Sequence, residues 1–159
     1  MEDLEEYLEP FIEVSENVFE TLGGVKITAG RPYIVSRDTV HEWDISAIIG
    51  LAGEARGAVV ISFKQNTALQ LATQMSGKTF IDWDDMVIDI IGEIINIIAG
   101  KAKQRLEEKF RLVISLPSII RGKEHAIWWP GDAPRIICIP FKIFGNDSFT
   151  LSVTLEPSI

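Results

Sequence analysis

One segment, residues 84–108, carries side chains whose types and spacing could support chemistry. Its positions that are not aliphatic recur every three or four residues, which on a helical period of 3.6 places them on one line, here called the polar stripe: Asp85, Asp89, Glu93, Asn96, Gly100, Lys103 and Glu107. Almost every other position from 86 to 106 is aliphatic, so the helix should expose only this stripe. Glu93 can pair with a cation of a partner, and the amide of Asn96 can hold a water for attack on a phosphoryl group. That chemistry needs no nucleophile from this chain.

Three interpretations of the polar stripe are open: a solvated helix side, a metal site or a docking face. Two carboxylates and an amide, Asp89, Glu93 and Asn96, make a weak site for a transition metal when no histidine joins them. Asparagine is a poor helix former, and Glu or Lys would suit a merely solvated side better. Gly92 and Gly100 each cost roughly 1 kcal/mol relative to alanine inside a helix. These costs favour a docking face that a partner approaches closely. Together with the weak ligand set, they predict that the stripe holds no metal or cofactor of its own.

Several other functional classes are excluded by composition and by missing motifs. The formal charge of −8 argues against nucleic acid as a partner. The sequence contains no HExxH, GxSxG or P-loop motif, and its two histidines, His41 and His125, are far apart and are expected to be loop residues. Gly77-Lys78-Thr79 resembles the end of a P-loop but follows a helical pattern rather than a strand. The single cysteine, Cys138, lies in an apolar run typical of a core.

The pattern of elements predicts a single α+β domain over residues 1–159, with long helices on a mostly antiparallel sheet. A first helix should begin near Pro10 and stop at Gly23-Gly24, a short helix should be capped by Asn66, and a long helix should span 84–108. The expected strands are 25–35, 44–52, 58–63, 112–120, 126–129, 135–144 and 149–155, the last one half-buried. The helix-plus-three-strand order suggests one unit used twice, with Arg31-Pro32 and Leu116-Pro117 at similar places.

The residues around the stripe resemble a known family. Asp89-x3-Glu93-x2-Asn96, followed by Gly100, is similar to the motif of the CheC, CheX and FliY chemotaxis phosphatases, and residues 48–63 resemble that family's glycine-punctuated hairpin. The resemblance implies hydrolysis of the aspartyl phosphate of a CheY-type response regulator. Glu93 would pair with the regulator's lysine, Asn96 would position water, and magnesium would sit in the regulator. Asp89, Gly100 and Lys103 would complete the partner-binding face.

The first helix does not repeat this motif well. Val14 stands three residues before Asn17, and Glu13 is displaced by one position. This departure favours the one-site, dimeric CheX type over the two-site CheC type. A non-catalytic docking module for a response regulator or a flagellar switch component is the alternative, and turnover would distinguish the two.

The sequence also predicts a homodimer joined along sheet edges, with the polar stripes left free. The observation that indicates an edge is Pro140 within a predicted strand, because proline is confined to edges and bulges. The apolar pair Trp128-Trp129 could add interface area. The apolar run at 86–99 is too short and too polar for a bilayer, and no secretory signal is evident, so the cytosol is the expected compartment.

Overall fold

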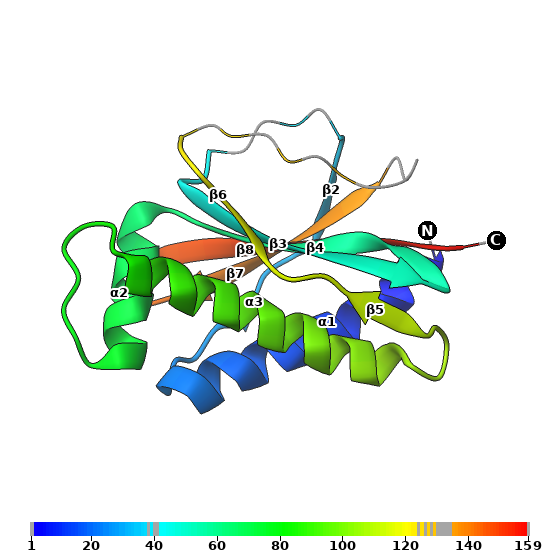
Figure 1. Cartoon of the computed structure of the whole chain (residues 1–159), viewed down its shortest axis with the longest axis horizontal. Helices are drawn as coiled ribbons and strands as arrows, with labels where there is room; N and C mark the ends of the chain where they lie inside the picture. The colour runs from blue at the N-terminus through cyan, green and yellow to red at the C-terminus, as the bar shows by residue number, and fades with distance from the viewer. Residues whose placement is uncertain are drawn as a thin grey trace.

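The protein folds into one antiparallel sheet with three helices packed against one of its faces. The computed structural model describes residues 2–37, 39, 42–123, 125, 127, 129 and 135–158, with side chains from residue 6 onwards. Figure 1 shows α1 and α3 side by side beneath the sheet, and strands β2 and β6 rising above it. The predicted α+β architecture is confirmed.

The sheet is built from eight strands in the order β1-β7-β8-β4-β3-β5, with β2 also pairing β7 and β6 also pairing β3. The strands are β1 Thr28–Ala29, β2 Tyr33–Val35, β3 Ile45–Gly53, β4 Ala55–Phe63, β5 Leu112–Ile114, β6 Ser118–Arg121, β7 Ile136–Ile143 and β8 Asp147–Pro157. The predicted hairpin is β3–β4, which turns tightly at Gly53 because that residue has a φ of 116°. The expected strand at 126–129 falls partly outside the described residues.

Helix α1 spans Glu2–Gly23 and continues through Pro10, although the sequence predicted a regular start near that proline. The expectation was wrong because tertiary contacts hold the turn that precedes it. Tyr7 packs edge-on against Phe110 with ring centroids 5.5 Å apart, and Glu6 forms an ion pair with Lys109. Farther along, Phe19 stacks on Phe149 of β8, which seats the helix on the sheet.

The other two helices, α2 (Gln65–Ser76) and α3 (Asp85–Leu106), follow in direct succession. The sequence predicted that Asn66 caps α2, and this prediction was wrong. The cap position is Lys64, and Asp44 accepts a hydrogen bond from the first helical amide at 2.7 Å. The α3 N-cap is Asp84, whose carboxylate accepts from Met86 N at 2.8 Å. None of the helices in the described part of the chain is long and apolar enough to cross a membrane.

Strand β8 is buried on both faces, whereas alternation had predicted a half-buried strand. Phe149, Leu151 and Val153 face the helices, and Thr150 and Ser152 on the opposite face are 3% exposed. A second apolar cluster on that face explains the difference: Ala58, Val60, Ile127, Trp129 and Ile136. Hydroxyl groups tolerate this burial because they find partners, as in the 3.2 Å contact between Ser152 Oγ and Cys138 Sγ.

The sequence context of Pro140 predicted an edge strand, but the strand that contains Pro140 has neighbours on both sides. Strand β7 pairs β8 on one side and both β1 and β2 on the other, and Pro140 lies at the gap between these two short strands. Its missing amide therefore costs no ladder bond, while its carbonyl accepts from Gly30 N at 2.7 Å. Leu116-Pro117 similarly separates β5 from β6 along β3, but a repeat of the whole unit stays a prediction.

Candidate functional site

Helix α3 holds the polar stripe away from the core. Its apolar side is fixed against the sheet and the other helices by fully buried residues that include Val87, Ile91, Ile95 and Ile98. On the outer side Asp89 and Glu93 are exposed and Asn96 is half-buried. Residues three or four apart on a helix have neighbouring side chains, so the Glu93 carboxylate and the Asn96 amide face the same space.

That space is an open groove of about 430 Å³ between α3 and the segment that joins β5 to β6. On the helix side it is lined by Asp89, Glu93 and Asn96, and on the other side by Leu116 and Pro117. The charged lining residues are both acidic. The groove therefore suits a partner that brings a cation.

The three polar side chains of the groove have no partner within the described part of the chain. Neither a hydrogen bond nor an ion pair joins Asp89, Glu93 or Asn96 to another described side chain or backbone group. A half-buried amide with free donors and acceptor is available to a ligand, because it has no internal bond to give up. The groove thus presents one carboxylate pair and one amide to whatever enters it.

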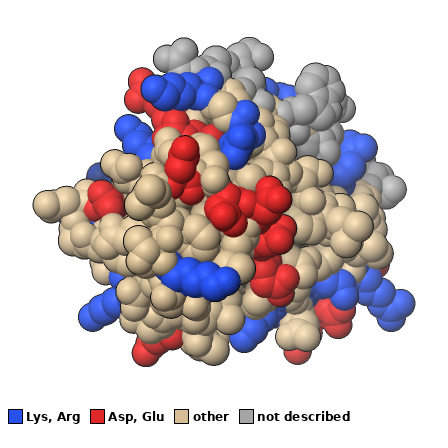
Figure 2. All heavy atoms as spheres, turned by 60° about the vertical axis from the view of Figure 1, so that its left-hand side comes forward, with Lys and Arg blue, Asp and Glu red and all other residues tan. Residues whose placement is uncertain are grey.

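The acidic character extends from the groove towards the start of α3. Asp82, Asp84 and Asp85 precede Asp89 and Glu93 along the chain. Figure 2 shows acidic side chains gathered in a band on this side of the molecule. Such a band attracts a basic partner surface over distances of about a Debye length and falls off with salt.

The remaining stripe residues differ in how free they are. Gly100 faces open space, since a methyl group placed there would meet no atom within 4 Å. Lys103 is engaged by Glu107 at 3.2 Å, one helical turn on. Gly92, by contrast, is buried against the chain's own Pro117 and Ile119, so its small size serves an internal approach as well as the groove.

The exposed side of α3 is wider than the sequence predicted. Met86 is 36% exposed, and Ile90 and Ile97 are half-buried rather than embedded. Leu116 and Pro117 are not among the predicted site residues, because the sequence pattern predicts one continuous strand over residues 112–120. Pro117 in the sequence Ser115-Leu116-Pro117 could have indicated that the strand is interrupted there, since proline disfavours continuous strand pairing.

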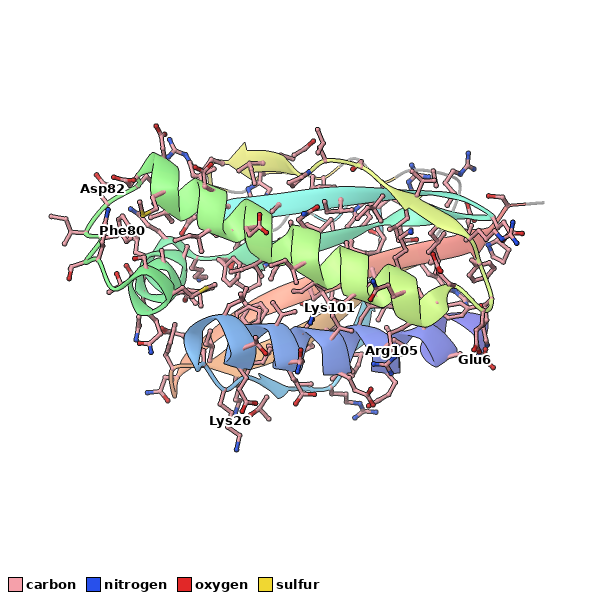
Figure 3. The ribbon with its side chains drawn as sticks, turned by 60° about the horizontal axis from the view of Figure 1, so that its bottom comes forward. Glu6, Lys26, Phe80, Asp82, Lys101 and Arg105 are labelled. Carbon is pink, nitrogen blue, oxygen red and sulfur yellow. The ribbon has the colours of Figure 1, made fainter. Side chains whose placement is uncertain are left out.

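A second groove, of about 500 Å³, lies between α1 and α3 and contains the imperfect motif of the first helix. Glu13 accepts a hydrogen bond from Arg105 at 2.7 Å, and Asn17 accepts one from Lys101 at 3.4 Å. Figure 3 shows Lys101 and Arg105 in the space between the two helices, with Glu6 at the far end of α1. The acid and amide of α1 are therefore satisfied internally, unlike those of α3.

Other candidate chemistry does not assemble into a site. His41 lies outside the described residues, and His125 contacts Ser46 Oγ through Nε2 at 2.6 Å and Gly122 O through Nδ1 at 2.8 Å. No cluster of three or more metal-ligating side chains occurs among the residues that the structure describes. Cys138 is buried, as predicted.

The fold and the groove together define an α+β domain that offers a helix-borne acid and amide to a partner. The family model for the chemotaxis phosphatase CheX matches residues 45–142. The chain belongs to this family, so the resemblance noted in the sequence, and the prediction of a phosphatase, are confirmed.

Three similar proteins illustrate the relationship. The CheY-P phosphatase CheX of Thermotoga maritima is 28% identical over 145 residues, covering 88% of this chain and 91% of the relative. A putative chemotaxis protein from Desulfovibrio vulgaris Hildenborough has 32% identity and a TM-score of 0.84, over 95% of this chain and 97% of that one. CheX in the CheX–CheY–BeF3–Mg²⁺ complex of Borrelia burgdorferi has 27% identity and a TM-score of 0.81, over 94% and 97%.

Proposed function

We propose that this protein hydrolyses the aspartyl phosphate of a CheY-type response regulator, with Glu93 as the anchor and Asn96 as the catalytic amide. The observation that carries the proposal is the Glu93–Asn96 pair, which no described residue engages, in an open groove of a chemotaxis phosphatase fold. Two relatives support it: one is named a CheY-P phosphatase, and another is seen in complex with CheY and BeF3.

In this mechanism the chain supplies position rather than a nucleophile. The Asn96 amide accepts one hydrogen bond from a water and directs the water's oxygen at phosphorus. The oxygen–phosphorus bond forms as the bond between phosphorus and the aspartyl oxygen breaks, which yields inorganic phosphate and a free carboxylate. Magnesium belongs to the regulator's site, and no residue of this groove needs to hold it.

The Glu93 carboxylate contributes a charge-assisted contact to the regulator's active-site lysine. Such contacts fix the register of an interface and speed its formation, and removal of one partner costs affinity because the other charge is left unpaired. Because Asn96 lies three residues farther along the same helix, one docked lysine places the amide at a fixed distance from the phosphoryl group. Asp89 adds negative potential at the edge of the groove.

We also propose that the chain forms a homodimer along its β1–β2 edge. In the described part of the chain, β2 pairs only with β7, so its outer backbone groups are available, and Tyr33 and Ile34 on it are 46% and 48% exposed. This edge is at the opposite end of the strand order from β5 and β6, so the Glu93–Asn96 groove of each protomer stays free. Trp129 is buried in the second apolar cluster and so does not add interface area as expected, whereas Trp128 lies outside the described residues. Sedimentation of wild type and Ile34→Lys tests this: the mass of two chains should fall to one.

The experiment that tests the function compares a catalyst with a binder. Phosphorylated CheY-type regulator is mixed with one-twentieth of its concentration of this protein, and phosphate release is followed. A catalyst shortens the lifetime of the whole pool, whereas a docking module changes it only in proportion to the complex formed. An unchanged lifetime for the regulator pool would reject the proposal.

A further inference from the structure

The connection between β5 and β6 places a leucine at the rim of the groove. Leu116 is 85% exposed and lines the groove opposite Glu93 and Asn96. Pro117 follows it directly and packs near Gly92, where a methyl group would lie 3.8 Å from the proline Cγ. The apolar rim and the polar stripe are therefore two walls of the same groove.

The backbone that carries Leu116 is held in place. Ser115 N donates to Gly50 O at 3.0 Å, and Gly50 N donates back to Ser115 Oγ at 2.8 Å. The same hydroxyl donates to Leu116 O at 2.9 Å, and the proline ring fixes φ at the next residue. At the far end of β6, the guanidinium of Arg121 lies over the Trp83 ring at 5.3 Å, which ties the strand to the loop before α3.

A single exposed leucine is ordinary on a protein surface, so exposure alone argues nothing. What distinguishes Leu116 is that it is presented on a fixed backbone at the edge of a groove whose polar groups bind no other described residue. A side chain on a fixed backbone loses only its own rotamer freedom on binding, so less of the free energy gained by burial is lost to ordering the chain. The buried centre of an interface is more apolar than the rest of the surface, and its rim is polar, so an apolar group beside a charged contact fits the border between the two.

We infer that Leu116 is the apolar anchor for the response regulator, covering an apolar side chain next to the regulator's phosphoryl pocket while Glu93 engages the lysine. This inference rests on the function proposed above. Continuity with the Glu93–Asn96 groove selects the regulator as occupant, rather than another partner. Leu116 thereby acts in docking and in the choice among regulators, and takes no part in the chemical step.

The test uses Leu116→Ala in the full chain, with Val113→Ala as matched control. Val113 is 68% exposed on neighbouring β5 but does not line the groove. Leu116→Ala should raise KM for phosphorylated regulator about tenfold and leave kcat within about twofold, the split expected of a docking contact. Leu116→Met should restore most of the affinity, and Val113→Ala should change neither constant. An unchanged KM in Leu116→Ala, or an equal rise in Val113→Ala, would overturn the inference.

Affinity for BeF3-loaded regulator gives a second readout that does not depend on turnover. Weaker binding by Leu116→Ala supports the anchor, even if the wild type binds without hydrolysis and the proposed function fails. Unchanged binding rejects the anchor even if the wild type is an active phosphatase. Sedimentation of Leu116→Ala should give the wild-type mass; a loss of self-association would instead assign the rim to an interface between copies and overturn the inference.

Discussion

Arg105 on α3 donates a hydrogen bond to Glu13 on α1, with 2.7 Å between Nη2 and Oε2. This contact occupies the carboxylate that would belong to a second site on the first helix. Lys101 meets Asn17 in the same groove at 3.4 Å. The two grooves beside α3 therefore differ in kind: in one, Arg105 and Lys101 engage the acid and amide of α1, and in the other, the acid and amide are left to a partner.

We expect Glu13→Ala and Asn17→Ala to leave turnover of phosphorylated regulator within about twofold of wild type. The exposed pair with Arg105 should contribute only about 0.2–1 kcal/mol to the free energy of unfolding. Phosphate release and urea unfolding of the two variants measure these effects. A tenfold loss of turnover in either variant would show that the first helix carries an active site after all.

Replacing Glu93 with alanine should weaken association by about 2–5 kcal/mol, because the regulator's lysine is left without its counter-charge in the interface. Titration of BeF3-loaded regulator measures the affinity. Glu20→Ala on α1 removes the same charge from an exposed position and serves as the control. If Glu93→Ala bound normally and only the maximal rate fell, the anchor role would be wrong.

Gly100→Ala separates stability from docking at one position. Alanine meets no atom there and has the better helix propensity, so the free energy of unfolding should rise by up to about 1 kcal/mol. Affinity for the regulator should fall, since a close approach to the helix is then blocked. Gln104→Ala, on the side of α3 that faces α1, should leave affinity unchanged. Unaltered binding by Gly100→Ala would remove this glycine from the docking face.

The helix that carries the site was predictable, whereas its surroundings depended on long-range pairing. The start of the helix near Asp84 and the outward line of Asp89, Glu93 and Asn96 follow from local pattern alone. The second wall of the groove does not, because Leu116 reaches α3 only through the pairing of β5 and β6 with β3.

Local pattern also failed where distant segments approach one another. Gly57 falls between the expected strands 44–52 and 58–63 but lies within β4, where a methyl group would stand 1.8 Å from the carbonyl oxygen of Thr154. Pro10 remained helical because Tyr7 and Phe110 pack together. In each case a contact remote in sequence overrides the preference of the individual residue.

Stability should fall in alkaline solution. Burial raises the pKa of the Cys138 thiol above its ordinary 9.0, and the partial burial of the Tyr33 hydroxyl, together with the nearby Cys138, raises the pKa of that hydroxyl above 10.0. The unfolded chain therefore loses these protons first, so the contribution to stability is complete below about pH 9 and is lost as pH rises through the raised values. Urea unfolding between about pH 7.5 and 10.5 measures the slope. Cys138→Ala should flatten it, and an equally steep slope in that variant would assign the effect to other groups.

The most direct test of the account is the turnover of Asn96→Ala. The amide orients water and anchors little, so the variant should fold normally, bind BeF3-loaded regulator with nearly wild-type affinity and lose phosphate release by about 100-fold or more. The lifetime of phosphorylated regulator, measured with a substoichiometric amount of each protein, gives the comparison. Near wild-type turnover in Asn96→Ala would contradict the mechanism at its centre.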